Sequence, residues 1–453
     1  MRDMTRGSIG RHLLAYAIPM IAGNILQLTY NAVDSVIIGK YLGEDALAAV
    51  GTANPVMTIM ILGASGIGIG ASVLISKFYG AKDFEGLKKE FSTTVIFGVF
   101  FSFLVFLVGF LLSGDILKMI NTPDTIFLQA RTYLRTIFVG FLFTFQYNVI
   151  SSALRGIGDS KTPVVFLGVS CCMNVILDLV FVAGIGMGVK GAGLATIISE
   201  GISVICCIIY IYKRVPVLKL RTDEFAVDRI MLSETLKTGL LTALQQAAQP
   251  VGKVIIQGVV NTQGVAAIGA FNAVCRIDDF ACIPSQSIGS GIMSCTAQNR
   301  GAGFRERTGE TFRKGFAVAL IYFPIICSLT LLLKKPAVGI LTPRGSSMLA
   351  IGVGYLSVKA WFFIMPCINN AIQGYFRGMG KMGVVLACTL IQITIRTICV
   401  SLWVPRMGIE GEAWACFTGW ICQAVFEFVY YLYYRKKYLR LPLKNVDNAN
   451  KRW

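Results

Sequence analysis

The stretch LRGIGDSK at residues 154–161 recurs in shortened form as FRGMGK at residues 376–381, and this repetition decides the fold. Other pairs keep the same order at a spacing of about 220 residues. They match AAVG at 48–51 with AAIG at 266–269, and MGVKG at 187–191 with MGIEG at 407–411. An ordered series of matches indicates an internal duplication, so we predict two homologous lobes, residues 1–225 and residues 226–453.

The composition places both lobes in a membrane. Hydrophobic residues make up 55% of the 453 residues and charged residues only 15%, which is too apolar for a chain whose surface faces water. Long apolar stretches predict an all-α polytopic membrane protein with twelve transmembrane helices in two pseudo-symmetric six-helix lobes. The predicted spans are 13–38, 47–75, 91–113, 131–153, 163–185, 190–212, 234–260, 265–296, 312–334, 352–376, 382–404 and 409–434. Six spans per lobe give both lobes the same orientation, related by a pseudo-twofold axis along the membrane normal.

The formal net charge of +18 has a membrane explanation. Lysine and arginine concentrate between alternate spans, at Lys213–Lys237 and Arg300–Lys314, and in a tail that begins at Arg435. This bias predicts a cell inner membrane location with both termini in the cytoplasm, and attraction to anionic lipids at that face. The positive charge therefore does not need nucleic-acid binding as its explanation. The first apolar run lacks a small-residue cleavage site, so we expect it to remain as a helix rather than be removed as a signal peptide.

Several kinds of chemistry find no support in the sequence. His12 is the one histidine and no CxxC pair accompanies the 13 cysteines, so we expect no metal centre and assign the cysteines to helix packing. GASGIGIG at 63–70 resembles a phosphate loop superficially, but it lacks the Lys-Ser/Thr ending and lies within an apolar span, where close helix packing is the better interpretation. We therefore expect no enzyme activity and no cofactor, with transport driven by an ion gradient.

Ionisable side chains inside predicted spans are costly in lipid and indicate function. Asp34 lies late in the first span, Asn174 and Asp178 are one helical turn apart in the fifth, and Thr196 and Glu200 share a face of the sixth. Two carboxylates with amide and hydroxyl oxygens can form a cation site for H+ or Na+. The alternative is structural: each carboxylate only hydrogen-bonds a neighbouring helix.

The second lobe differs at the equivalent positions. Gly252 takes the place of Asp34 and Arg396 that of Asn174, so the predicted cation site is one-sided. The other charged residues of this lobe favour a self-neutralising buried network, with direct contact to substrate in a cavity as the alternative. These residues are Lys253, Arg276, Asp278, Asp279 and Arg396.

Nearly the whole chain resembles multidrug and toxic compound extrusion (MATE) transporters. The resemblance rests on several segments, which are IPMIAGNILQLTYNAVDSVIIGKYLG (18–43), ALAAVG (46–51), LRGIGDSKTP (154–163), NVILDLVF (174–181) and GVKGAGLAT (188–196), with AAIGAF and AQNRGAG in the second half. It implies twelve helices in two lobes, alternating access about a central cavity, and efflux of hydrophobic, mostly cationic drugs against H+ or Na+.

The pattern is most similar to the DinF-like branch, and the resemblance implies functional residues. It marks Asp34, Asn174, Asp178 and Thr196 as the cation site, and adds Gln27, Tyr133 and Asn148 as cavity or surrounding residues. The NorM-like branch instead carries an acidic residue in the seventh helix. This chain has Gln245, Gln246 and Gln249 there and no carboxylate, which speaks against an ion site of that type in the second lobe. From the sequence itself, Pro19 predicts a kink in the first helix that can couple site occupancy to helix bending.

These observations predict a monomeric efflux antiporter whose only bound ion is the coupling H+ or Na+. A lipid-linked precursor or polysaccharide flippase is the first alternative, kept open by Lys253, Arg276 and Arg396. A membrane-embedded enzyme such as a glycosyl polymerase is the second, and the short external loops offer little for its chemistry.

Overall fold

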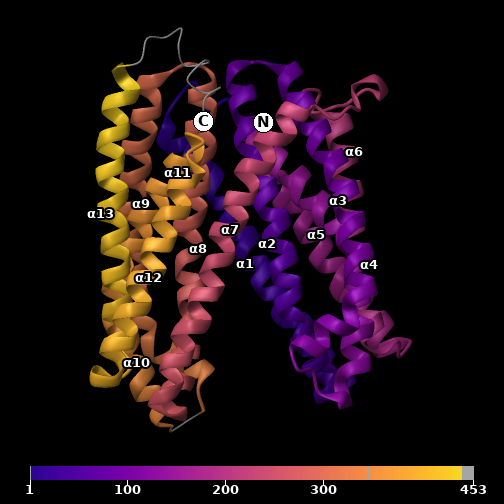
Figure 1. Ribbon diagram of the computed structural model, residues 1–453, viewed down its shortest axis with the longest axis vertical. Coiled ribbons are helices and arrows are strands. Elements are labelled where there is room, and N and C mark those ends of the chain that lie inside the picture. Colours follow the sequence, from indigo (N-terminus) through magenta and orange to yellow (C-terminus); the bar gives the residue numbers. More distant parts are fainter. Residues whose placement is uncertain (1, 344–345, 441–453) are drawn as a thin grey trace. The chain divides into compact units, whose positions relative to one another are not determined.

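The computed structural model describes residues 2–343 and 346–440, and these residues are almost entirely helical (Figure 1). The first half contains α1 (Ile9–Leu42), α2 (Glu44–Ala81), α3 (Phe84–Met119), α4 (Asp124–Gly156), α5 (Lys161–Asp178) and α6 (Gly188–Arg214). The second contains α7 (Arg229–Val260), α8 (Val265–Gly301), α9 (Arg305–Leu341), α10 (Ser347–Phe362), α11 (Ile364–Gly378), α12 (Met382–Met407) and α13 (Glu410–Arg440). Most of the predicted basic tail lies outside the described residues.

Within the described residues, nine helical segments are long and apolar enough to cross a membrane. The pair α10 and α11 passes the same test only when taken together, and the two helices meet at a 44° bend that the sequence prediction of one helix at 352–376 missed. The two long helices that fall short are α7 and α8, which carry the polar residues of the second half. Each of the twelve predicted spans nevertheless coincides with helical segments to within one residue: 352–376 covers the bent pair, 163–185 covers α5 and the π-helical turn that follows it, and each of the others covers one helix. Short helices also occur in connections, among them the π-helical turn η1 (Leu179–Gly184) after α5 and the 3-10 turn η3 (Asn261–Gln263) after α7.

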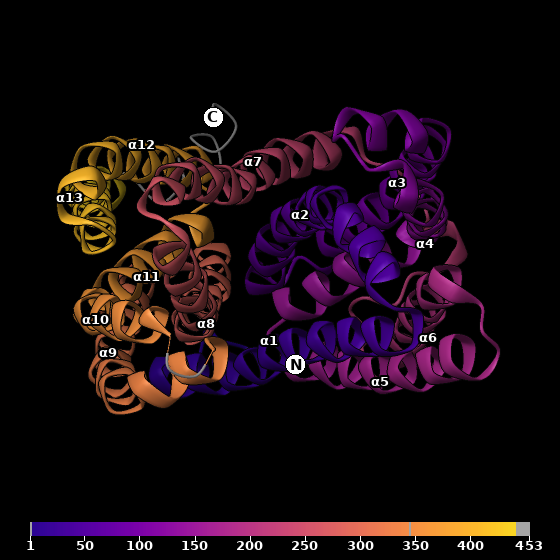
Figure 2. The same cartoon turned by 90° about the horizontal axis from the view of Figure 1, so that it is seen from below.

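The chain forms two compact units that exchange short segments. Unit 1 comprises Met1–Asp3 and Pro19–Ala243, and unit 2 comprises Met4–Ile18 and Leu244–Trp453. Seen end-on, α1 and α7 are the helices that pass from one unit to the other (Figure 2). A division at residue 225 does not anticipate this exchange, because it follows the sequence repeat and not the packing of helix ends.

The segment Met4–Ile18 is fixed in unit 2 by polar contacts near its start. The backbone N–H of Met4 donates to Oε1 of Gln298 at 2.9 Å, and Nδ2 of Asn299 donates to the Met4 carbonyl at 3.2 Å. The Arg307 guanidinium donates to the carbonyl of Gly7 at 2.7 Å. Gln298 and Asn299 lie on α8, and Arg307 lies on α9. These two helices therefore hold residues 4–18 in unit 2 before α1 continues into unit 1.

The connection between α6 and α7 is fastened to α3 within unit 1. It contains the short 3-10 helix η2 (Thr222–Glu224). The Lys88 ammonium donates to the Glu224 carboxylate at 2.8 Å, and this bond, with one from the Arg221 backbone N–H, lowers the pKa of Glu224. The backbone N–H of Asp228 donates to Oγ1 of Thr93 at 2.9 Å, so α7 starts against α3.

The glycine run at 63–70 serves helix packing, as the sequence interpretation favoured. A Cβ atom added at Gly66 would lie 2.7 Å from the backbone nitrogen of Ala243, and one at Gly70 would lie 2.9 Å from that of Gly239. The helices α2 and α7 thus approach backbone to backbone, which only small residues permit. At Gly63, by contrast, nothing lies within 4 Å of the added atom.

We expect Gly66→Ala to destabilise the protein by about 1 to 3 kcal/mol, because the added methyl group cannot be accommodated without moving α7. Gly63→Ala is the matched control: it adds the same methyl in open space, and helix propensity makes it neutral or stabilising by up to about 1 kcal/mol. Melting temperatures of the two purified variants in detergent measure the difference. Equal melting temperatures would contradict backbone contact between α2 and α7.

Candidate cation site

A cluster of polar side chains lies inside unit 1, where α1, α5 and α6 approach one another. Asp178 and Asn174 are 0% and 1% exposed, on the last turns of α5. Asp34 of α1 and Thr196 of α6 are partly buried. Asp178 is followed directly by η1, and π-helical turns of this kind occur frequently at functional sites.

Asn174 joins the other members of the cluster. In the amide orientation that satisfies both of its ends, its nitrogen donates to Oδ2 of Asp178 at 2.8 Å. Its oxygen accepts from the backbone N–H of Thr196 at 3.1 Å and from Oγ1 of Thr196 at 3.3 Å. Assigning the amide from its partners is the usual way to settle such an orientation. Asn174 therefore ties α5 to α6 and orients the Asp178 carboxyl group.

The two carboxyl groups lie within hydrogen-bonding reach of each other. Among the described residues, Oδ1 of Asp34 and Oδ1 of Asp178 are buried and have no hydrogen-bond partner. Two carboxylates this close repel each other, and burial makes their ionised forms more costly, so the pair favours taking up a positive charge. Oxygen ligands of this kind suit a proton or a hard cation such as Na+.

Two tyrosines border the carboxyl pair. Tyr133 of α4 is 3% exposed and close enough to Asp34 and Asp178 for direct electrostatic interaction. Tyr30 of α1 lies within hydrogen-bonding reach of the Thr196 side chain. The sequence prediction included Tyr133 and missed Tyr30, although Tyr30 precedes Asp34 by one helical turn and so shares its face.

The other predicted residues lie apart from this cluster. Gln27 and Asn148 line a neighbouring cavity of about 160 Å³ within unit 1. Glu200, which sequence reasoning left undecided, lines the same cavity and accepts a hydrogen bond from Thr144. Pro19 lies inside the continuous helix α1, at the residue where the chain enters unit 1, and the predicted kink stays a prediction.

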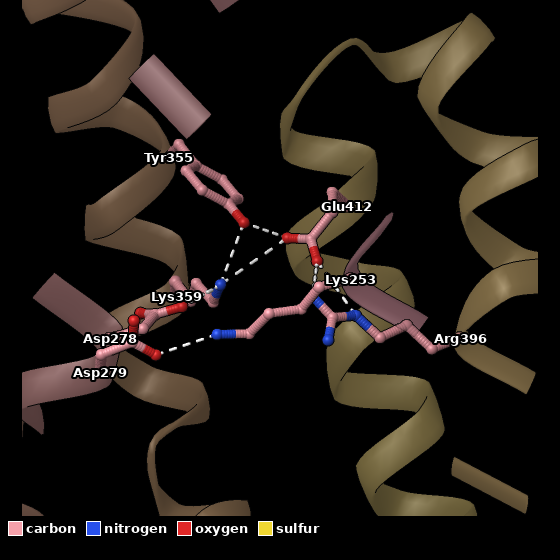
Figure 3. A network of polar contacts seen from close by, with 7 residues as sticks. All are labelled: Lys253, Asp278, Asp279, Tyr355, Lys359, Arg396 and Glu412. Atoms are coloured by element: carbon pink, nitrogen blue, oxygen red, sulfur yellow. Dashed lines mark hydrogen bonds and ion pairs between the residues drawn. The ribbon is translucent and has the colours of Figure 1, made fainter. Parts of the chain in front are cut away.

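Unit 2 holds a network of ion pairs at the equivalent place (Figure 3). Lys359 of α10 pairs with Asp278 of α8, and its Nζ lies 3.8 Å from the Glu412 carboxylate. Glu412 of α13 also accepts from Arg396 of α12 and from the hydroxyl of Tyr355. Two acids and two bases balance one another, as a self-neutralising network requires.

The membership of this network differs from the sequence prediction. Lys359, Glu412 and Tyr355 were missed, while Lys253 and Asp279 form a separate, half-exposed pair at 2.9 Å. Arg276 is exposed, and no ion pair to it occurs among residues 2–343 and 346–440. A signal for Tyr355 existed, because it follows Tyr133 at the repeat spacing and both tyrosines are buried beside charged groups.

Comparison with known proteins agrees with this architecture. The sequence model of the family described as MatE matches residues 19–180 and 242–402. The probable multidrug resistance protein YpnP of Bacillus subtilis is 29% identical over 447 residues, covering 97% of this chain and 98% of YpnP. A multidrug resistance MATE transporter solved in an outward-facing conformation superposes with a TM-score of 0.90 at 21% identity, covering 98% of each chain. A transporter from Pyrococcus furiosus, whose structure was described as having a binding pocket of reverse polarity, gives 0.89 at 21%, covering 97% and 98%. The chain is a member of the MatE family of membrane transporters and has its twelve-helix fold.

Proposed function

We propose that the protein is a multidrug efflux antiporter of the DinF-like branch, which exports hydrophobic, mostly cationic compounds in exchange for H+ or Na+. Its relatives carry names that refer to multidrug resistance or multidrug export, which supports drugs as substrates. The observation that carries the antiport mechanism is the pair of Asp34 and Asp178, each with one buried carboxylate oxygen that has no hydrogen-bond partner.

The coupling ion would bind at this pair, with Asn174 and Thr196 as neutral ligands or supports. Exchange requires that bound ion and bound drug weaken each other, and a typical coupling of about 1 to 3 kcal/mol corresponds to 5- to 150-fold weaker drug binding when the ion is present. Alternating access then releases the drug outward. We further propose a monomer in the inner membrane, with both termini and the anionic lipid contacts at the cytoplasmic face.

The flippase alternative depended on an unneutralised cationic surface. Arg396 is paired with Glu412 and Lys253 with Asp279, so two of its three supporting residues have carboxylate partners. The ion pairs of unit 2 therefore favour the antiporter over the flippase.

Ethidium efflux from cells that lack their own pumps tests the proposal under imposed pH and Na+ gradients. We expect the wild type to export ethidium when one of the gradients is present, and Asp34→Asn to abolish this at equal membrane abundance. Asp45→Asn is the control, since Asp45 is an exposed carboxylate at the start of α2. Wild-type cells that do not export the dye, or efflux indifferent to Asp34, would refute the antiport mechanism and favour the flippase.

A further inference from the structure

The cavity of about 160 Å³ in unit 1 adjoins the cation site but is not part of it. At about 30 Å³ per molecule, this volume accommodates roughly five waters. The helices α1, α4 and α6 each contribute hydroxyl, amide or charged side chains to its wall. A polar cavity of this size next to an ion site can hold a continuous chain of water.

The polar residues of the wall form stripes along three helices. On α1 they are Asn24, Gln27 and Tyr30, which continue at helical spacing to Asp34. On α4 they are Thr144, Asn148 and Arg155, and on α6 they are Glu200 and Ser203, which follow Thr196. Residues three or four apart share a helix face, so each stripe connects the level of the cation site with a level several turns away.

Glu200 is the residue of the α6 stripe that lies nearest in sequence to Thr196 of the cation site. It lies one helical turn after Thr196, and its carboxylate accepts a hydrogen bond from Thr144 of α4. Glu200 and Thr144 also line a second, smaller pocket of about 40 Å³ together with Thr196. Glu200 is therefore the carboxylate shared by the pocket that reaches the cation site and the larger polar cavity.

The far end of the cavity is defined by Arg155 and Ser160, at the last turn of α4 and just beyond it. The Arg155 guanidinium donates to Oγ of Ser152 at 2.9 Å. This end of α4 precedes a connection that the positive-inside distribution assigns to the cytoplasm. Two charged residues thus line the cavity, the acid Glu200 near the cation site and the base Arg155 near the proposed cytoplasmic end. The hydroxyl groups of Tyr30 and Tyr147 belong to the same wall.

We propose that Glu200 and this cavity form the route by which the coupling cation passes between the Asp34–Asp178 pair and the cytoplasm. The inference rests on the proposed function and adds a relay residue to it. A proton leaving the aspartate pair is taken up by the Glu200 carboxylate and returned to cavity water, so Glu200 ends the cycle as it began. If the ion is Na+, the same carboxylate provides a transient oxygen ligand.

The test uses the full-length protein in liposomes, with tetraphenylphosphonium as the transported cation. Two quantities are measured: tetraphenylphosphonium affinity with and without the coupling ion, and ion flux into or out of the vesicle upon a drug gradient. Flux is followed with a trapped pH dye and separately with radioactive Na+, which distinguishes H+ from Na+. We expect Glu200→Gln to slow ion flux at least tenfold while affinity and its ion dependence stay within twofold of wild type, and Glu200→Asp to recover part of the flux.

Glu90→Gln is the matched control. Glu90 is a fully buried carboxylate of α3 in the same unit, accepts hydrogen bonds from Thr94 and Thr235, and does not line the cavity. We expect its flux to equal that of the wild type. Normal flux in Glu200→Gln, equal loss in Glu90→Gln, or a Glu200→Gln protein whose drug affinity no longer responds to the ion would each overturn the relay. A wild type without any ion-coupled flux would refute the proposed function itself, and the relay with it.

Discussion

Glu412→Gln is expected to lower the free energy of unfolding by about 3 to 5 kcal/mol, the usual cost of breaking a buried ion pair from one side. Glu412 is 0% exposed and accepts hydrogen bonds from Arg396 and Tyr355. Without its charge, Arg396 loses its ion-pair partner, and the network keeps two buried bases against the single acid Asp278. Melting temperature and the midpoint of denaturation in mixed detergent measure the loss.

Two further variants separate charge burial from general damage to unit 2. Lys253→Met breaks the half-exposed pair with Asp279 and should cost no more than about 1 kcal/mol. Replacing Arg396 and Glu412 together by leucine removes both charges, so it should recover most of the loss of the single variant. If Glu412→Gln proves no less stable than Lys253→Met, the network is not buried as described.

Asp178→Asn is expected to uncouple drug and ion binding. In the wild type we expect the coupling ion to weaken drug binding 5- to 150-fold, the range of a typical coupling energy. Asparagine at 178 keeps the size and one acceptor but removes the charge that holds the ion, so the drug Kd should become the same with and without the ion. Titration of fluorescent drug binding to the purified protein, at several ion concentrations, measures the coupling.

Asn174→Ala is the comparison variant for this second prediction. Asn174 orients the Asp178 carboxyl group without supplying charge, and supporting residues of this kind typically change ion affinity about 10- to 100-fold. Full coupling should therefore return at high ion concentration in Asn174→Ala and not in Asp178→Asn. A drug Kd that still responds to the ion in Asp178→Asn would exclude Asp178 from the site.

The helical fold was predictable because it rests on local properties. Apolar length marks a span wherever it occurs, and the repeat marks the two halves, so the predicted spans coincide with helical segments to within one residue. The bend between α10 and α11 was not predictable, since residues 352–376 read as one apolar run and the break depends on packing. The exchange of helix ends between units also depends on contacts between residues hundreds of positions apart, such as Met4 with Gln298.

The site residues divide in the same way: spacing along a helix predicted some of them, and others come together only through packing. Spacing along one helix placed Asn174 beside Asp178, and the structure joins them by a hydrogen bond. Sequence reasoning missed Lys359 because it is a single charge in an otherwise apolar span, and Glu412 because it lies near the start of a span, where charges are ordinary. Only the packing of α8, α10, α12 and α13 brings these two residues together with Asp278 and Arg396.

The segment exchange has a consequence for biosynthesis. Residues 4–18 are translated long before their partners on α8 and α9, which the ribosome reaches only after the helices α1 to α7 have been made. The amino-terminal segment must therefore wait, inserted or at the membrane surface, while unit 1 assembles without it. Two polypeptides cut at residue 225 would each carry a segment that packs with the other, so neither fragment would contain all the residues of one unit.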